Sequence, residues 1–245
     1  MNPRVTVATA VRVLMQLRRD PRTIALIVGV PCLLVTLLRY LFDAQPGTFD
    51  RIGGTMLGLF PFITMFIVTS ITMLRERVTG TLERLMTLPL AKLDLLLGYA
   101  IAFALLAVVQ ATIVSLLAFG LLDLNVQGSH VAVIALAVGN ATLGMALGLF
   151  ASAFARTEFQ AVQFMPAIVF PQVLLSGLFV PRGRMAHWLE VISDAFPLTY
   201  AYDALSRVTD DRGLGNWFAL DLVVTIGSTL LALALGAATL RRRTA

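Results

Sequence analysis

Residues 54–74 read GTMLGLFPFITMFIVTSITML and contain no ionisable side chain, and the charged triplet RER follows at residues 75–77. A helix needs roughly 20 apolar residues to cross the hydrocarbon core of a bilayer. Charged residues next to such a run are typical of the border with water. The stretch therefore predicts a membrane-spanning helix that ends in a charged segment.

Similar apolar runs recur along the chain, which is 58% hydrophobic and only 13% charged. A soluble domain carries roughly 25% charged residues, so too little polar surface is left to face water. We expect an all-α integral membrane protein that forms a single domain over residues 1–245 and needs no nucleic-acid partner. The six predicted spans are Ile24–Phe42, Gly54–Leu74, Leu95–Leu121, His130–Ala155, Ala161–Val180 and Trp217–Leu240.

The distribution of charge predicts how the spans are oriented. Most basic residues, including Arg241–Arg243, fall into the segments on the same side as the two termini, whereas most acidic residues fall on the other side. Basic residues accumulate in cytoplasmic loops. Both termini are therefore expected in the cytoplasm, in a multi-pass protein of the cell membrane. Cys32 is the only cysteine, which excludes an internal disulfide.

A basic amphipathic segment precedes the first span, at about residues 4–20. Its apolar residues recur at helical spacing, and its arginines share another face, which is typical of a helix lying in the cytoplasmic interface near lipid headgroups. The alternative is a basic flank that only sets the topology. The apolar residues are Val7, Val11, Leu14 and Leu17, and the polar face holds Arg12, Gln16 and Arg19.

The segment after the second span reads RERVTGTLERLMTLP, residues 75–89. As a helix over about residues 75–88 it would place apolar side chains on one face and charged ones on another, and Pro89 would end it. Such a helix can pack on the membrane domain and offer charges to a cytosolic partner; a solvated amphipathic loop is the alternative. The apolar face would hold Val78, Leu82, Leu85 and Met86, and the polar face Arg77, Thr81 and Arg84.

Residues 182–212 are long for a loop and too broken to span. Met185, Trp188, Leu189 and Ile192 would share one helical face, and Pro197 can begin a second short helix. We expect short re-entrant helices that dip into the outer leaflet between the fifth and sixth spans. A small outer cap lying on the membrane is the alternative.

Two motifs resemble those of type-2 ATP-binding-cassette (ABC) exporter permeases, in particular the daunorubicin-resistance-like branch. The first is Arg75-Glu76 with GTLERL at residues 80–85 and Leu88-Pro89, which is similar to the family's coupling-helix segment. The second is LSGLFVP at residues 175–181 with FPLTYAYDAL at residues 196–205, which is similar to its outer exit and re-entrant region.

The resemblance implies a half-transporter in a bacterial cell membrane. A second permease copy or a paralogue would complete the transmembrane dimer, and two copies of a separate ATPase subunit would bind ATP and Mg²⁺. The cargo would be a hydrophobic drug-like or lipid molecule; an envelope polysaccharide or glycolipid is the alternative. Implied contacts with the ATPase are Arg75, Glu76, Arg77, Gly80, Thr81, Leu82, Glu83, Arg84 and Leu85, and implied exit residues are Ser176, Gly177, Pro181, Trp188, Phe196, Pro197 and Tyr200.

The residues themselves place nucleotide chemistry elsewhere. A P-loop ends in Gly-Lys-Ser/Thr, whereas the only lysine, Lys92, lies in the sequence LAKL. His130 and His187 are the only histidines, so a membrane protease or metal centre is not expected, and we predict no cofactor in this chain. An ion-coupled transporter or channel is a further alternative, but it usually carries ionisable residues in mid-membrane, and none is evident.

Four polar residues lie within the predicted spans, at Gln110, Asn140, Gln163 and Gln172. A polar side chain in lipid needs a partner. These four could line a substrate path or hydrogen-bond across helices, and the sequence leaves both interpretations open.

Overall fold

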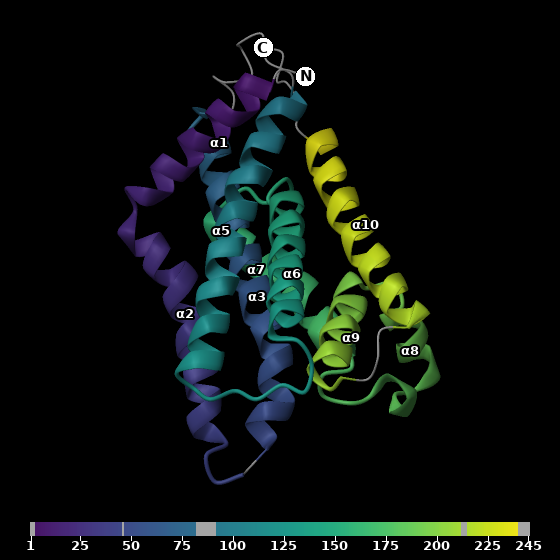
Figure 1. Ribbon diagram of the computed structural model, residues 1–245. Coiled ribbons are helices and arrows are strands. Elements are labelled where there is room, and N and C mark those ends of the chain that lie inside the picture. Colours follow the sequence, from purple (N-terminus) through teal and green to yellow (C-terminus); the bar gives the residue numbers. More distant parts are fainter. Residues whose placement is uncertain (1–2, 46, 82–91, 212–214, 240–245) are drawn as a thin grey trace.

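The computed structural model describes residues 3–45, 47–81, 92–211 and 215–239, and for residues 92 and 93 it describes the backbone alone. These residues fold into a helical bundle (Figure 1). The all-α class predicted from the sequence is confirmed. The helices are α1 (Pro3–Arg18), α2 (Pro21–Leu41), α3 (Thr48–Val78), α5 (Lys92–Gly120), α6 (His130–Ala151), α7 (Glu158–Leu175), the 3₁₀ turn η1 (Arg182–Arg184), α8 (His187–Ser193), α9 (Pro197–Thr209) and α10 (Asn216–Thr239).

Five of these helices are long and apolar enough to cross a membrane, namely α2, α3, α5, α6 and α10. The fifth predicted span, Ala161–Val180, overlaps α7, which is not among the five. The helix has 18 residues and ends at Leu175, so it is about 27 Å long at 1.5 Å per residue, and glutamines and two prolines interrupt its apolar sequence. Five spans are thus supported, and the span predicted over Ala161–Val180 stays a prediction.

Local capping sets where several helices begin. Asp20 caps α2: its carboxylate accepts hydrogen bonds from the Thr23 backbone N–H at 3.2 Å and from the Thr23 hydroxyl at 2.6 Å. Pro21 follows as the first helical residue, where a missing N–H costs nothing. Thr157 caps α7 by accepting from the Gln160 N–H at 3.2 Å.

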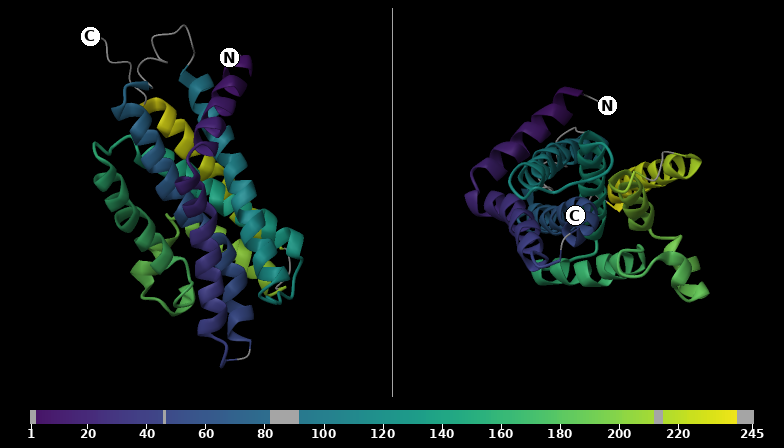
Figure 2. Two further views of the ribbon diagram at one scale, coloured as in Figure 1. Left: turned by 90° about the vertical axis from the view of Figure 1, so that its left-hand side faces the viewer. Right: turned by 60° about the horizontal axis from the view of Figure 1, so that its bottom comes forward.

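Helix α3 lies near the centre of the bundle, surrounded by α2, α5, α6 and α7 (Figure 2), and packs most extensively against α6. The two helices approach closely because α6 presents glycine there. A Cβ atom on Gly144 would collide with the Phe62 carbonyl oxygen, and one on Gly148 with the Phe66 carbonyl oxygen. The Thr69 hydroxyl, which donates to the Met65 carbonyl oxygen of its own helix at 2.6 Å, also lies 3.2 Å from the Met145 carbonyl oxygen of α6. Small residues that let backbones meet are typical of helix contacts in membranes.

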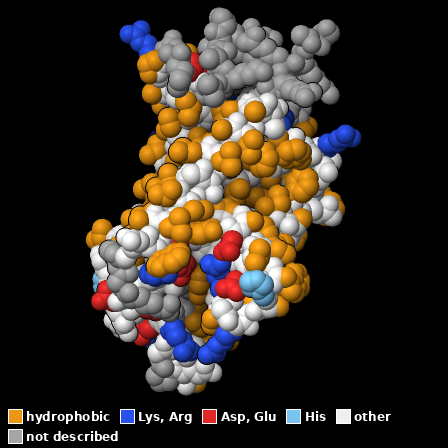
Figure 3. All heavy atoms as spheres, turned by 90° about the vertical axis from the view of Figure 1, so that its right-hand side faces the viewer, with side chains coloured by type: hydrophobic (Ala, Val, Ile, Leu, Met, Phe, Trp, Pro, Cys, Tyr) orange, Lys and Arg blue, Asp and Glu red, His pale blue; other side chains and the backbone are white. Residues whose placement is uncertain are grey.

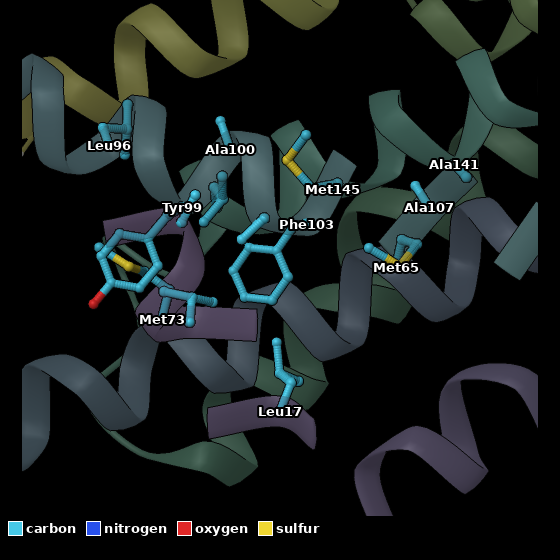
Figure 4. Close-up of a cluster of buried hydrophobic side chains, with 14 of the residues drawn as sticks. Leu17, Met65, Met73, Leu96, Tyr99, Ala100, Phe103, Ala107, Ala141 and Met145 are labelled. Atoms are coloured by element: carbon cyan, nitrogen blue, oxygen red, sulfur yellow. The ribbon is translucent and has the colours of Figure 1, made fainter. Parts of the chain in front are cut away.

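Helix α1 descends along α5 from the end of the molecule where α10 finishes, and the chain then turns into α2 (Figure 1). A Cβ atom on Gly98 of α5 would meet the Thr6 carbonyl oxygen at 2.9 Å, so this contact also depends on glycine. Below it, Leu17 packs in a buried cluster with Tyr99 and Phe103 of α5 and Met73 of α3 (Figure 4).

The face of α1 that packs inward agrees only in part with the predicted apolar face, since it includes Leu17 and Leu14 but not the two valines. Ala10, Val13 and Leu17 are buried, whereas Val7 and Val11 are exposed. Thr9, which lies against Gly98 of α5, is also on the inward face, so this contact turns Val7 and Val11 outward. The helix predicted at about residues 4–20 is present as α1; its position in the membrane interface stays a prediction.

Apolar side chains cover the outer face of α10, and charged side chains gather toward the end where α8 and α9 lie (Figure 3). Trp217, Val223, Leu230 and Leu231 are all more than half exposed on this helix. Such a surface suits contact with lipid rather than water.

Candidate functional site

The end of α3 carries the first three predicted coupling residues. Helix α3 continues through Arg75, Glu76 and Arg77 to Val78, and Gly80 then adopts a left-handed φ of 72°. The Thr79 hydroxyl donates to the Arg75 carbonyl oxygen at 2.8 Å, which closes the last turn. Residues 75–78 thus belong to the spanning helix, which ends before Gly80. Most of the coupling helix predicted at about residues 75–88 lies outside the described residues and stays a prediction.

The other predicted coupling residues divide at this turn. Thr81 follows Gly80, and its hydroxyl lies 3.0 Å from that of Thr79. Leu82, Glu83, Arg84 and Leu85 lie outside the residues that the structure describes, so their role stays a prediction.

Glu76 is buried and joins three helices. Its Oε2 atom accepts from Nη1 of Arg12 in α1 at 3.4 Å, and Nη2 of Arg12 donates to the Tyr99 hydroxyl of α5. The Glu76 side chain is 9% exposed and that of Arg12 is 28% exposed. This Arg12–Glu76–Tyr99 network gives Arg12 partners within the protein, and a buried carboxylate such as Glu76 requires a cation beside it. Whether α1 also lies near lipid headgroups stays a prediction.

Arg75 points the other way and joins α3 to α7. Its Nε and Nη2 atoms donate to the two carboxylate oxygens of Glu158, at 2.7 and 3.0 Å. This paired geometry is the strong form of an arginine–carboxylate contact. Both side chains are more than half exposed, so the pair contributes little stability by itself but fixes the start of α7 against the end of α3.

The contacts of Arg12, Glu76 and Tyr99 and those of Arg75 and Glu158 together form a charged junction at the end of α3. A cavity of about 330 Å³ opens beside it. Its polar wall includes Asp20, Arg75 and Glu76, and Leu17 of α1 contributes to its apolar wall. Hydrogen bonds from Thr23 hold the pKa of the Asp20 carboxyl below its usual value, so this group is ionised at neutral pH. The cavity thus brings one end of α1, α2 and α3 together around charged groups.

The polar residues predicted within spans fall into two groups. Gln110 is fully buried, and its Nε2 atom donates to the Ile27 carbonyl oxygen of α2 at 2.7 Å. Asn140 is buried against Gly58 of α3. Gln172 is also buried and donates to the Ile168 carbonyl oxygen in its own helix at 3.0 Å. Gln163 alone of the four is exposed. For Gln110 this placement favours a bond between helices.

A pair of variants can separate these roles. We expect Gln110→Leu to lower the free energy of unfolding by about 0.6 kcal/mol, a typical value for a hydrogen bond between membrane helices, and to leave the substrate range unchanged. Gln163→Leu, on an exposed face, is the matched control and should leave stability unchanged. Thermal unfolding and transport of a substrate panel measure both. A changed substrate range in Gln110→Leu would return that residue to the path.

The predicted exit residues surround a short helical region. Ser176, Gly177 and Pro181 line a cavity of about 300 Å³ together with Tyr202 of α9. Gly177 has a φ of 99°, a value that favours glycine, so the chain turns sharply after α7. Trp188 of α8 is 64% exposed.

Helix α9 begins at Pro197, as predicted, and is held to the segment before it. The Thr199 hydroxyl donates to the Ser193 carbonyl oxygen at 2.8 Å, and the Tyr200 hydroxyl donates to the Asp194 carbonyl oxygen at 3.0 Å. Phe196 is half-buried and precedes the helix. The region between α7 and α10 therefore contains short helices, whereas their depth in the outer leaflet stays a prediction.

Sequence reasoning missed several charged partners. Arg207 of α9 contacts Asp203 at 2.8 Å and the buried Asp221 of α10 at 3.5 Å, and Glu158 and Tyr99 complete the contacts of Arg75 and Arg12. The four-residue spacing of Asp203 and Arg207 was a detectable helix signal. The contacts between different helices had no local signal.

These features define a polytopic helical membrane protein with a charged junction at one end and short helices at the other. The model of the ABC-2 type transporter family matches residues 4–208. The chain belongs to this family.

Named relatives are similar to the chain over much of its length. It is 28% identical over 159 residues to ABC transporter G family member 20 of Dictyostelium discoideum, covering 65% of this chain and 22% of the relative. It is 27% identical to the probable multidrug ABC transporter permease YbhR of Escherichia coli over 185 residues, which are 73% of this chain and 50% of the relative. It is 26% identical to the linearmycin resistance permease protein LnrN of Bacillus subtilis over 193 residues, which are 76% of this chain and 49% of the relative. The matched region thus spans half or less of each relative.

Proposed function

We propose that this chain is the membrane permease subunit of an ATP-driven ABC exporter. It moves a hydrophobic drug-like or lipid molecule out of the cytoplasm or the inner leaflet, and a separate ATPase subunit, in two copies, supplies the energy by binding ATP and Mg²⁺. A second permease copy or paralogue completes the transmembrane pair. Membership of the ABC-2 type transporter family supports this function, and so do the multidrug and resistance permeases among the relatives.

The charged junction at the end of α3 is the observation that carries the proposal. The segment that resembles a coupling helix begins in the last turn of α3, and its first residues are tied to α1 and α5 through Glu76 and to α7 through Arg75. A displacement of this segment by the ATPase would therefore reach four helices at once. A structural element tied to several others is what transmission between subunits needs.

The path for cargo is better supported along α3 than at the predicted glutamines. Half-exposed residues form a stripe on α3 that includes Phe60, Ile63, Thr64 and Ile67. The stripe is mostly apolar, which suits hydrophobic cargo. Gln163, exposed on α7, remains a candidate for the path.

Docking of the ATPase subunit tests the proposal. We expect Glu83→Ala combined with Arg84→Ala to abolish co-purification of the cognate ATPase subunit and ATP-driven transport in proteoliposomes, because both charged groups in the coupling segment are lost. The matched control, Asp43→Ala combined with Arg51→Ala, also removes one acidic and one basic residue, but near the α2–α3 connection. If the Glu83/Arg84 double variant keeps docking and transport at the level of the Asp43/Arg51 control, the assignment of residues 83 and 84 to the coupling segment is overturned.

A further inference from the structure

One arginine lies between two carboxylates where α9 meets α10 (Figure 1). Arg207 of α9 donates from Nε and Nη2 to Oδ2 of Asp203, one turn earlier in the same helix, at 2.9 and 2.8 Å. Its Nε atom also lies 3.5 Å from Oδ2 of Asp221 in α10, which is longer than an ordinary N–H···O hydrogen bond. Arg207 is thus bonded within its own helix and lies just beyond bonding distance of the next one.

The Asp221 carboxylate is the more buried of the two and the less satisfied. Asp221 is 4% exposed, and its Oδ2 atom accepts no hydrogen bond within the part of the chain that the structure describes. The Asp203 side chain is 34% exposed, so water can solvate it. A buried carboxylate without a hydrogen bond costs more free energy than an exposed one. The guanidinium therefore bonds the carboxylate that burial penalises less.

Arg207 cannot bond both carboxylates fully through Nε. This atom carries a single hydrogen, so shortening its 3.5 Å separation from Asp221 by a few tenths of an ångström weakens its bond to Asp203. Two exclusive arrangements result. In one, Arg207 is bonded inside α9, and in the other it joins α9 to α10.

The surrounding charges are compatible with both arrangements. Arg182 lines a cavity of about 300 Å³ together with Asp203, so Asp203 keeps a cation near it when Arg207 leaves. Arg182 is itself bonded to Ser193 and Asp194, but a guanidinium has five N–H donors, more than these contacts use. Helix α6, which also packs on α10, contains no Asp, Glu, Lys or Arg. No competing charge therefore comes from that side.

Helix α9 is also joined to α3, which carries the charged junction at its other end. A Cβ atom on Gly54 of α3 would collide with Thr209, and one on Gly58 with Leu205, so the two helices are in direct contact. A displacement of α3 therefore reaches α9, and with it the position of Arg207 relative to α10.

We propose that Arg207 is a switch that alternates between Asp203 and Asp221, so that an ion pair joins α9 to α10 in one step of the transport cycle and is released in another. The switch connects α10 to the predicted exit, because Asp203 lines the same cavity as Ser176 and Gly177. The place of the switch in the cycle rests on the proposed function, whereas the exchange itself does not.

Thermal unfolding of single and double variants of the full chain tests the exchange. Asp203→Asn removes the charge that competes for Arg207, so Arg207 should move onto Asp221. Asp221→Asn should then lower the melting temperature about 2–4 °C further in the Asp203→Asn background than in the wild-type background, the shift that one additional ion pair produces in a chain of this length. Equal shifts in the two backgrounds would overturn the exchange.

ATP hydrolysis by the complex with its ATPase subunit in nanodiscs tests the place of the switch in the cycle. We expect Asp203→Asn and Asp221→Asn each to slow hydrolysis about fivefold, because each favours one arrangement by the strength of one partly exposed ion pair. Asp43→Asn is the matched control, since Asp43 also pairs with an arginine four residues away, Arg39, at 2.9 Å, and it should leave hydrolysis unchanged. Unchanged hydrolysis in both test variants, or an equal fall in the control, would overturn the switch.

Docking of the ATPase subunit is recorded in the same samples. A wild-type chain that neither docks the ATPase subunit nor supports ATP hydrolysis would overturn the proposed function, and the melting temperatures would still decide the exchange. Docking and hydrolysis together with equal melting shifts would overturn this inference alone.

Discussion

Replacing Gly144 with leucine is expected to prevent α3 and α6 from packing and to abolish recovery of folded protein. The Cβ atom alone would collide with the Phe62 carbonyl oxygen, and neither backbone can move without disturbing the rest of the contact. A milder variant, Gly144→Ala, should lower the free energy of unfolding by about 1–3 kcal/mol, the usual cost of overpacking. Thermal unfolding in detergent, followed by size-exclusion chromatography, measures both.

The same helix offers the control. Gly139 of α6 has nothing within 4 Å of its Cβ position, so Gly139→Ala should leave stability unchanged or raise it slightly, since alanine favours helix over glycine. Equal unfolding temperatures for Gly144→Ala and Gly139→Ala would contradict the packing argument.

Loss of Glu76 is expected to have the second largest effect. Glu76→Ala leaves the partly buried Arg12 guanidinium without its carboxylate, and truncating one partner of a buried ion pair costs about 3–5 kcal/mol. We expect a value near the lower end, because the Arg12 side chain keeps 28% exposure. Under the proposed function, ATP-driven transport should fall further than stability alone explains, because α1 is then released from α3.

A double-mutant cycle isolates this interaction. The double variant Arg12→Leu with Glu76→Leu should lose less free energy of unfolding than the single variants Arg12→Leu and Glu76→Leu lose in sum, because the double variant leaves neither charge unpaired. Tyr99→Phe should cost only about 1 kcal/mol, the value of one hydrogen bond. Strict additivity of the two single variants would show that Arg12 and Glu76 do not interact.

The sequence predicted the spanning helices well because a backbone in lipid must satisfy its own hydrogen bonds, which leaves an apolar run little choice but a helix. The run at residues 54–74 is an example, and it lies entirely inside α3. The end of α3 was harder to predict, since no residue in Arg75–Val78 stops a helix at the membrane border. The left-handed conformation at Gly80 ends it instead, and a single glycine in a helical pattern does not reveal its φ.

The charged junction could be predicted only in part. Arg75, Glu76 and Arg77 were identified through a family motif, but the partner of Glu76 is 64 residues away and that of Arg75 is 83 residues away. Many arginines precede the first span, and no local pattern distinguishes Arg12 from Arg18. Gln110 illustrates the same limit, because its acceptor, the Ile27 carbonyl oxygen, is a backbone atom that any residue would supply.

The dependence of α3 on α6 has a consequence for how the protein is made. Val78 leaves the ribosome 73 residues before Ala151 completes α6, a delay of about 4–15 s at 5–20 residues per second. During that interval α3 resides in the bilayer without the glycine face that receives Phe62 and Phe66. A nascent chain stalled before His130 therefore cannot acquire its central contact, and the newly inserted hairpin of α2 and α3 depends on lipid or on the insertion machinery until α6 arrives.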